Sequence, residues 1–425
     1  MVRTKNKGKS LTFKILLGMG TGLVTGLVLS YLGNSGWINS YLVSGVLDVG
    51  GKIFISSLKL LVVPLVFVSL VCGTASLEDV KKIGRIGGKT LAFYLGTTAG
   101  AIAVALLIGF IINPGAGFVI DSKVKYEASA IPPLSQTLIN IVPSNPIKAM
   151  AEGEMLQIIF FALLFGLALV MTGKRSERIT TLFNDLNEVI MKMVLMLMAL
   201  APYGVFCLMA KIFAEQGIAV ILPLGRYFLA VLAALFIHAF LFYPILLKVF
   251  SNLNPIVFLK KFKEVAVFAF TTASSNATLP VTLENVEHKL GVKNSIASFT
   301  IPLGATINMN GTAIMQGLAT MFIAQVYGLD IGVVGYLTVI LMGTLAAIGT
   351  AGVPGVGLIT LAMILKQVNL PVEGIALIIG VDRLLDMTRT VVNVMGDSVV
   401  TCIVARSEKQ LDESVYYDEN AEKKH

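Results

Sequence analysis

The sequence predicts an all-α membrane protein whose chain crosses the bilayer many times. Of its 425 residues, 56% are hydrophobic and only 14% are charged, whereas soluble domains carry about 25% charged residues. Several apolar stretches, among them residues 13–32, 90–112 and 221–242, reach the roughly 20 residues that a helix needs to cross a bilayer. Basic residues gather in short segments between such stretches, which is typical of cytoplasmic loops.

The composition argues against several other classes of protein. The net charge of +8 does not indicate nucleic-acid binding, because the basic residues are spread over the loops. Cys72, Cys207 and Cys402 are far apart and lie in apolar segments, so we expect neither a disulfide framework nor a zinc site. The first apolar run is longer than the core of a usual signal peptide, and we expect it to be retained.

Positive charge predicts the orientation of the chain. Clusters of Lys and Arg precede the first apolar run and recur at residues 81–85, 174–178 and 260–263. The positive-inside rule places these clusters in the cytoplasm. The intervening loops, such as residues 115–133, are poorer in Lys and Arg, so six spans precede residue 263. Both termini are then cytoplasmic, and we expect a multi-pass protein of the plasma (inner) membrane.

The second half contains two interruptions that an ordinary spanning helix lacks. They lie at residues 271–280 and 349–357, and long apolar segments follow them at residues 296–324 and 374–404. Non-helical backbone within a bilayer is tolerated only where protein or water satisfies its polar groups. We therefore expect eight transmembrane helices plus two re-entrant helical hairpins, arranged as inverted repeats with binding sites between them.

The last long segment carries five charged residues. One helix face, an arc of roughly 80°, is shared by Asp382, Asp386, Arg389, Asn393 and Asp397. Five charges in lipid would cost roughly 12 to 18 kcal/mol, so this face must meet protein, ions, substrate or water. Arg389 can hold a carboxylate through two hydrogen bonds, Asp386 an ammonium and Asn393 an α-carboxylate oxygen. Asp397, one turn further, is placed to bind a cation.

A structural alternative for this face is a neutral buried bridge between Asp386 and Arg389, three residues apart. Such a bridge carries a desolvation penalty and leaves Asp382, Asn393 and Asp397 unexplained. We therefore favour a site for an anionic substrate that also has an amino group. An acidic amino acid meets both conditions. Aspartate and glutamate differ by one methylene, which typically changes the binding free energy by about 1 to 3 kcal/mol, and the sequence does not distinguish between them.

A second polar motif, residues 306–312, lies between the two interruptions. Asn and Gly are poor residues for a helix interior, and local unwinding would free backbone carbonyls for a small cation. Asn308 and Asn310 would add side-chain oxygens of the kind that hard cations prefer. The alternative is a patch of small residues that packs against another helix.

Together these motifs resemble the dicarboxylate/amino acid:cation symporter family. Residues 274–280, 308–312, 349–355 and 382–397 occur in the order and spacing of that family, and the similarity covers nearly the whole chain. The resemblance implies a homotrimer of elevator-type transporters and no enzymatic activity. It also implies no cofactor beyond a co-transported cation, which we expect to be Na⁺.

The resemblance further implies a division of the chain into a fixed and a moving part. Residues 1–85 (first two spans, with trimer contacts) and 136–215 (fourth and fifth spans) would form the scaffold. Residues 86–135 (third span and extracellular loop) and 216–407 (sixth span to eighth span with both hairpins) would form the transport domain. Residues 408–425 would be a mobile cytoplasmic tail.

Site residues follow from the same resemblance. The implied substrate-binding residues are Arg389, Asp386, Thr390, Asn393, Thr312, Ser274, Ser275, Val353, Pro354 and Gly355. The implied sodium ligands form three sets: Gly304, Asn308, Asn393 and Asp397; Thr306, Ala347, Ile348 and Thr350; and Tyr94, Thr97, Thr98, Asn308 and Asn310.

Two positions depart from the family pattern. Position 310 is Asn, where sodium-coupled glutamate transporters usually have Asp, and an amide supplies an oxygen without a charge. This departure puts the third sodium ion and the stoichiometry in question. Position 273 is Ala, where some prokaryotic relatives carry an Arg that supports the substrate site, and Arg383 is a possible replacement.

A proton-coupled carrier is the nearest alternative, because Asp382, Asp386 or Asp397 could titrate in a buried site. The sequence does not separate proton from sodium coupling. His238 lies in an apolar run, and we interpret it as a histidine bonded to a neighbouring helix rather than as a proton relay.

Two more distant alternatives are a channel and an enzyme. Clustered polar residues could line a passive anion pore, but mixed Asp and Arg on one face favour a closed binding site. An intramembrane hydrolase could use Ser274 or Ser275, yet no His or Lys is placed to activate either hydroxyl.

Overall fold

The protein is a bundle of helices. The structure, a computed structural model, describes residues 11–32, 36–75, 85–117, 142–349 and 355–418. Within them there is no sheet, only an isolated bridge between Val292 and Leu411. Five helical segments of the described part are long and apolar enough to cross a membrane: Phe13–Tyr31, Asn39–Ala75, Arg85–Ile112, Gln157–Met198 and Ile221–Ser251. The expected all-α membrane protein is confirmed, whereas eight spans with two re-entrant hairpins stay a prediction.

The elements of the first half run from α1 to η4. Their bounds are α1 (Leu11–Tyr31), η1 (Ile38–Leu47), α2 (Asp48–Ala75), α4 (Arg85–Ile112), α6 (Pro146–Glu152), α7 (Met155–Thr172), η3 (Gly173–Ser176), α8 (Glu177–Met198), α9 (Ala201–Gln216) and η4 (Gly217–Val220).

The second half is built mostly from shorter helices. Their bounds are α10 (Ile221–Ile237), η5 (His238–Phe242), α11 (Tyr243–Ser251), α12 (Pro255–Thr272), α13 (Ser275–Glu284), η6 (Asn285–Lys289), α14 (Asn294–Ile307), α15 (Asn310–Val326), α16 (Gly332–Gly349), α17 (Val356–Gln367), η7 (Val372–Gly374), α18 (Ile375–Ser407) and α19 (Glu413–Tyr417).

Helices α1 and α9 pack through a stripe of glycines. Gly18, Gly22 and Gly26 are four residues apart and share one face of α1. A Cβ at Gly22 would lie 2.7 Å from the backbone oxygen of Phe206, and one at Gly26 would lie 2.5 Å from that of Ala210. Only glycine lets the two backbones approach this closely, which is a common way for membrane helices to associate.

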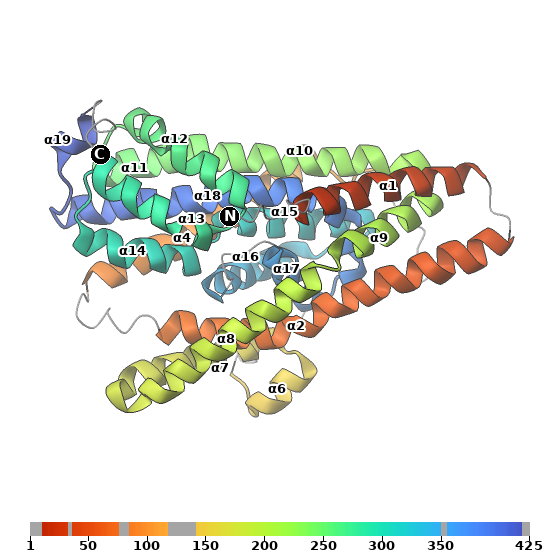
Figure 1. Ribbon diagram of the computed structural model, residues 1–425, viewed down its shortest axis with the longest axis horizontal. Coiled ribbons are helices and arrows are strands. Elements are labelled where there is room, and N and C mark those ends of the chain that lie inside the picture. Colours follow the sequence, from red (N-terminus) through yellow and green to blue (C-terminus); the bar gives the residue numbers. More distant parts are fainter. Residues whose placement is uncertain (1–10, 33–35, 76–84, 118–141, 350–354, 419–425) are drawn as a thin grey trace, which may run out of the picture.

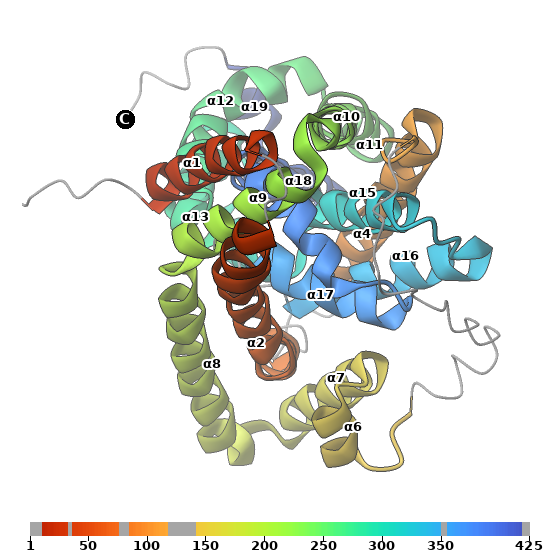
Figure 2. The same ribbon diagram turned by 90° about the vertical axis from the view of Figure 1, so that its right-hand side faces the viewer.

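Helices α2, α7 and α8 lie together at one side of the bundle, away from α18 (Figure 1, Figure 2). Aromatic rings join these three helices. Phe67 of α2 stacks on Phe161 of α7 with ring centroids 5.9 Å apart, and meets Phe183 of α8 edge-on at 5.9 Å. Such pairs stabilise a contact beyond the area they bury. These helices therefore form a layer with its own packing.

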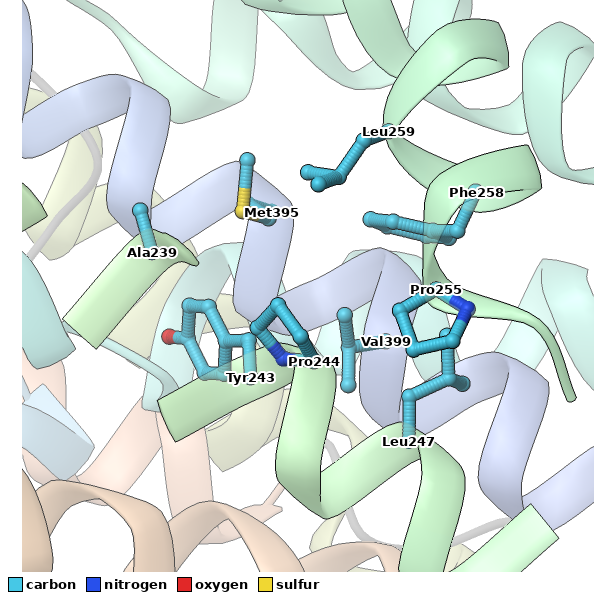
Figure 3. Close-up of a pocket in the computed structure, with 9 residues that line it drawn as sticks. All are labelled: Ala239, Tyr243, Pro244, Leu247, Pro255, Phe258, Leu259, Met395 and Val399. Carbon is cyan, nitrogen blue, oxygen red and sulfur yellow. The ribbon is translucent and has the colours of Figure 1, made fainter. Parts of the chain in front are cut away.

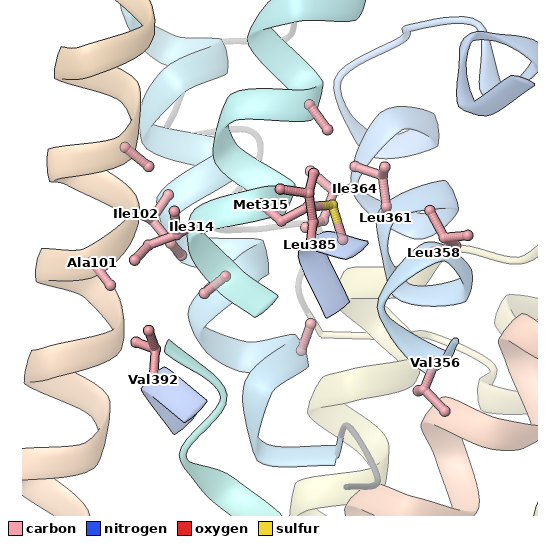
Figure 4. Close-up of a cluster of buried hydrophobic side chains, with 14 of the residues drawn as sticks. Ala101, Ile102, Ile314, Met315, Val356, Leu358, Leu361, Ile364, Leu385 and Val392 are labelled. Carbon is pink, nitrogen blue, oxygen red and sulfur yellow. The ribbon is translucent and has the colours of Figure 1, made fainter. Parts of the chain in front are cut away.

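Helix α18 lies at the centre of the bundle (Figure 2). With 33 residues it is about 50 Å long, and it packs against α9, α10, α12, α14 and α15. Figure 4 shows buried apolar side chains where α4, α15, α17 and α18 meet, including Ala101, Ile102, Ile314, Met315, Leu361, Leu385 and Val392. This close packing fixes α15 and α18, which carry the polar motifs.

The first predicted helix interruption is present at residues 273–274. Helix α12 ends at Thr272, and Ala273 has left-handed backbone angles (φ 49°, ψ 37°). Ser274 is extended and caps α13, its hydroxyl accepting a hydrogen bond from the Ala277 N–H at 3.2 Å. Helix α16 ends before, and α17 begins after, residues 350–354, which lie outside the described residues.

The motif between the two helix interruptions is also unwound. Helix α14 ends at Ile307, and α15 begins at Asn310. Between them Asn308 (φ −98°, ψ 91°) and Met309 (φ −116°, ψ 48°) leave the helical region. The local unwinding predicted within residues 306–312 is therefore confirmed at residues 308–309, while the flanking residues are helical.

The segment after α18 differs from the expected mobile tail in its described part. Residues 408–418 pack against the bundle: the Lys293 N–H donates to the Gln410 oxygen at 3.0 Å, and the Asp412 N–H to the Gly291 oxygen at 2.8 Å. Tyr416 is fully buried and donates to the Asn254 oxygen at 3.0 Å. This docking could not be predicted from the charged composition of the segment, because it depends on one buried tyrosine and on backbone hydrogen bonds. Residues 419–425 lie outside the described part.

Candidate substrate and cation site

Four charged side chains of α18 form a continuous chain of ion pairs. Arg389 Nη1 lies 2.7 Å from Asp382 Oδ1, and Arg389 Nη2 lies 2.7 Å from Asp386 Oδ1. Asp386 Oδ2 in turn lies 3.1 Å from Arg383 Nη1. Spacings of three and seven residues correspond to about one and two helical turns, so these groups lie along one side of α18. Positive and negative side chains alternate along this row of ion pairs.

The ion-paired side chains of α18 are largely buried. Arg389 is 1% exposed and Asp386 8% exposed, and Asn393 and Asp397 on the same face are also buried, which confirms that the face avoids lipid. The Arg389 Nε atom is buried without a hydrogen-bond partner among the described residues. The bridge expected by the structural alternative is present, and it includes Asp382, which that alternative left unexplained. Asn393 and Asp397 lie outside the bridge.

The unwound motif docks directly on α18. The Asn308 amide donates to Asp397 Oδ1 at 2.8 Å and to the Asn393 backbone oxygen at 3.1 Å. Asn393 Oδ1 accepts from the Gly311 N–H at 2.7 Å. The Gly311 backbone passes so close to α18 that a Cβ would collide with the Arg389 backbone. The two predicted motifs, about 80 residues apart in sequence, thus form one site.

The oxygen-bearing side chains of Asn308 and Tyr94 lie near Asp397, which the Asn308 amide contacts through Nδ2. The Asn308 Oδ1 atom is buried without a partner in the part of the chain that the structure describes. A Cβ at Gly304 would lie 2.5 Å from Asp397 Oδ1 and 2.6 Å from the Tyr94 hydroxyl. Because Gly304 has no side chain, these two oxygen atoms can both lie close to its backbone. One carboxylate with amide and hydroxyl oxygens suits a hard cation of low charge. The described residues hold no cluster of three His, Cys, Asp or Glu for a transition metal.

A neutral network surrounds Asn310. Its Oδ1 accepts from the Thr98 hydroxyl at 2.6 Å, and its Nδ2 donates to the Tyr243 hydroxyl at 2.8 Å. His238 Nε2 lies 3.5 Å from the same Nδ2, as expected of a histidine bonded to a neighbouring helix. Thr98, a member of the third predicted sodium set, is therefore brought beside Asn310, whose oxygen is already engaged by the Thr98 hydroxyl. The hydroxyl of Tyr94, another member, donates instead to the Thr300 backbone oxygen at 2.9 Å.

Thr97, the remaining member of that set, is buried, and its hydroxyl donates to the Tyr94 backbone oxygen at 3.1 Å. The single hydroxyl hydrogen of Thr98 is shared between the same Tyr94 oxygen, at 2.8 Å, and Asn310 Oδ1, at 2.6 Å. The Thr97 hydroxyl is thus satisfied within α4, whereas the Thr98 hydroxyl also contacts Asn310 of α15.

The second predicted sodium set is brought partly together. A Cβ at Gly73 of α2 would lie 3.0 Å from the Ile348 backbone oxygen and 3.7 Å from Thr306 Cγ2, so these two residues lie near the same point. Ala347 is buried, and Thr350 lies outside the described residues. A role of this set in cation binding stays a prediction.

The start of α17 reaches the charged chain. A Cβ at Gly357 would lie 3.1 Å from Thr312 Cγ2 and 3.6 Å from Arg389 Nη2. Gly355, with φ of 87°, borders Met198 of α8, at 2.6 Å from the position of an added Cβ. Val353 and Pro354 lie outside the described residues.

The remaining predicted substrate-binding residues make most of their contacts within their own helices. The Thr390 hydroxyl donates to the Asp386 backbone oxygen at 2.9 Å. Ser275 is buried at the start of α13, next to the capping residue Ser274. Thr312 lies 3.5 Å from Asn393 Nδ2. The part that these residues play in substrate binding stays a prediction.

Tyr243 lies in the candidate site but was not predicted from the sequence. Its hydroxyl contacts Asn310 and donates to the Val392 backbone oxygen at 3.2 Å. Figure 3 shows its ring lining an apolar pocket with Phe258 and Met395, while its hydroxyl points away from Phe258. A tyrosine near a buried histidine in an apolar run was the available signal, because a buried phenol needs a partner.

Buried charges beside broken helices in a membrane-spanning bundle are the pattern of secondary transporters. Residues 11–407 match the model of the sodium:dicarboxylate symporter family, and the chain belongs to this family. It is therefore a membrane transporter and not an enzyme.

Curated relatives match over nearly their full length. The chain is 36% identical over 420 residues to the proton/glutamate-aspartate symporter of Escherichia coli (strain K12), covering 96% of this chain and 95% of the relative. It is 35% identical over 412 residues to the proton/sodium-glutamate symport protein of Bacillus caldotenax (95% and 96%). It is 32% identical over 416 residues to a C4-dicarboxylate transport protein of Bacillus subtilis (strain 168) (96% and 95%).

Proposed function

We propose that the chain is a secondary active symporter that imports an acidic amino acid, L-aspartate or L-glutamate, on an inward sodium gradient. The observation that carries this proposal is the buried Arg389, whose two Nη atoms each bind a carboxylate at 2.7 Å. A guanidinium in this geometry can exchange a protein carboxylate for that of a substrate. Asp386, released from it, then takes the amino group.

Cation coupling follows from the neighbouring oxygens. A cation at Asn308 Oδ1 and Asp397 would neutralise a buried carboxylate at the point where both Asn308 and Asn393 reach the substrate face. Cation and substrate then stabilise the same docking of the unwound motif on α18, and each raises the affinity for the other. Because both the cation and the substrate favour this docking, transport of the substrate is coupled to transport of the cation.

Proton coupling is the second candidate. The neutral network engages the Asn310 oxygen through the Thr98 hydroxyl at 2.6 Å, so a third sodium ion has less to bind there. The names of two relatives include protons, one of them alone and one together with sodium. In that case a buried aspartate carries the proton.

We further propose a homotrimer in the plasma membrane with cytoplasmic termini and an elevator movement of residues 86–135 and 216–407 against residues 1–85 and 136–215. Exposed polar contacts join the two parts, such as Lys59 of α2 with Glu373 of η7 at 2.9 Å. Lys366 of α17 donates to the Gly153 oxygen at 3.0 Å. Exposed pairs of this kind contribute little stability, so they permit the two parts to separate.

The test is uptake of radiolabelled aspartate and glutamate into proteoliposomes with sodium and proton gradients imposed separately. We expect saturable uptake that requires inward sodium and is abolished in Asp397→Asn. Asp330→Asn, a change of an exposed loop carboxylate that accepts only the local Gly332 N–H in the described structure, is the control and should leave uptake unchanged. Uptake driven by protons without sodium would establish the second candidate. No uptake under either gradient would refute the proposed function.

A further inference from the structure

Both oxygens of Asp386 already have cationic partners in this structure. Oδ1 lies 2.7 Å from Arg389 Nη2, and Oδ2 lies 3.1 Å from Arg383 Nη1. The Asp386 and Arg383 side chains are only 11% and 12% exposed, so this second pair is largely shielded from water. Asp386 is therefore not an unpaired carboxylate that requires the ammonium of a substrate.

The charges of the chain are balanced. Asp382 and Asp386 carry two negative charges, and Arg383 and Arg389 carry two positive charges. A substrate carboxylate that binds Arg389 takes the place of Asp386 at that guanidinium. Asp386 is then left with Arg383, and a buried carboxylate without any counter-ion is strongly unfavourable.

The identity of that remaining counter-ion decides which substrates are accepted. For an acidic amino acid, the substrate's ammonium can neutralise Asp386 at Oδ1. A C4 dicarboxylate has no ammonium, and only Arg383 at Oδ2 can then compensate the charge of Asp386. Without Arg383 the site would therefore discriminate against the dicarboxylate.

We propose that Arg383 is a positioning residue that makes the substrate's amino group dispensable, so that the site accepts C4 dicarboxylates as well as acidic amino acids. The inference rests on the proposed function, because it requires that Arg389 binds the substrate carboxylate. Arg383 acts through Asp386 and touches no substrate atom. It thereby sets selectivity rather than the ability to bind an anion.

The test measures uptake of radiolabelled aspartate and its inhibition by succinate in the full-length protein. In the wild type we expect succinate to compete with aspartate. In Arg383→Gln the inhibition constant of succinate should rise about tenfold or more, as expected for the loss of a charged hydrogen bond. The KM for aspartate should change less than about threefold, because its ammonium compensates Asp386.

Two further variants separate selectivity from folding. Arg383→Lys keeps the charge and should retain most of the inhibition by succinate. Arg406→Gln removes an arginine from the end of the same helix, where it pairs with Glu413 and is 40% exposed, and should change neither value. Thermal stabilisation of the detergent-solubilised protein by each ligand gives a second measurement that does not depend on transport.

The outcomes are distinct. Equal weakening of aspartate and succinate in Arg383→Gln, or no change in either, would overturn the inference. A wild type that takes up aspartate but ignores succinate would overturn it too, while leaving the proposed function intact. A wild type that takes up neither aspartate nor glutamate under any cation gradient would instead refute the proposed function, on which the inference rests.

Discussion

Two buried polar regions lie side by side in this protein and differ in charge. On α18, Asp382, Arg389, Asp386 and Arg383 form a chain of ion pairs. The side-chain amide of Asn310 on α15 forms hydrogen bonds with hydroxyls of α4 and α11 and with the imidazole of η5, and none of these groups is charged. The first region joins groups of one helix, whereas the second joins groups of several.

The difference teaches what each region can do. A charged group in a dry interior persists only while its counter-ion does, so a substrate ion can enter the first region by exchanging partners. A neutral hydrogen bond contributes only about 0.5 to 1.5 kcal/mol and does not require a charged partner. The second region therefore holds helices together, and changes that alter charge should have the largest effects.

Arg389→Cys removes the centre of the charged chain and gives the largest expected effect. We expect aspartate uptake to fall at least about a hundredfold, because Asp382 and Asp386 lose their shared partner and losing one partner of a buried pair costs about 3 to 5 kcal/mol. Arg389→Lys should recover only part of the activity, since one ammonium cannot reproduce two Nη contacts. Aspartate uptake with an unchanged KM in Arg389→Cys would show that Arg389 does not bind the substrate.

Asn310→Asp would turn the neutral region into a charged one. The new carboxylate would be buried beside Tyr243 and Thr98 without a cationic partner, which costs about 3 to 5 kcal/mol. We expect the purified variant to be less stable in choline chloride and to regain stability in sodium chloride, while the wild type changes less. Equal salt responses of variant and wild type would show that no cation is drawn to this position.

Gly311→Ala tests the contact between the two regions. An added Cβ would collide with the Arg389 backbone, and overpacking of this kind costs about 1 to 3 kcal/mol. Gly96→Ala is the matched control, because a Cβ at Gly96 meets nothing within 4 Å. Unfolding of both variants in mixed micelles should show destabilisation only for Gly311→Ala, and a stable Gly311→Ala would mean that the two backbones can move apart.

Glu408→Gln gives the smallest effect. Glu408 lies beyond α18 and pairs with Arg85 and Lys89 near the start of α4, in contrast to the buried ion pairs of α18. Hydrogen bonds from Lys89 and Arg85 lower the pKa of Glu408. A lowered folded-state pKa contributes stability that is present above the ordinary glutamate value of about 4.3 and is lost as pH falls through the folded value. We expect a lower melting temperature for Glu408→Gln at pH 7. The difference from wild type should shrink below about pH 4.3 and vanish once the pH is below the folded-state pKa of Glu408.

Glu284→Gln, a change of an exposed glutamate, is the control for this comparison and should match the wild type at both pH values. A difference between Glu408→Gln and wild type that persists unchanged at acidic pH would mean that the ion pair with Lys89 and Arg85 is not its source.

Much of the site could be predicted because periodicity and composition act locally. The spacing of Asp382, Asp386 and Arg389 required a buried face whatever the partners were, since charge in lipid is unfavourable. Poor helix formers at Asn308 and Gly311 predicted the unwound segment, which the structure contains. The pairing of Arg383 with Asp386 was not predictable, because the direction of a long side chain depends on its neighbours.

The sequence by itself determined an all-helical membrane protein, the positions of the helix breaks and the face of α18 that must be buried, because each depends on residues within a few turns of one another. Only the tertiary structure decided which groups meet: Asn308 with Asp397, Tyr243 with Asn310, and residues 408–418 with the bundle. These contacts depend on close approach of segments far apart in the chain. That approach is set by packing at positions such as Gly304 and Gly311, where the absence of a side chain matters only once the neighbouring helix is in place.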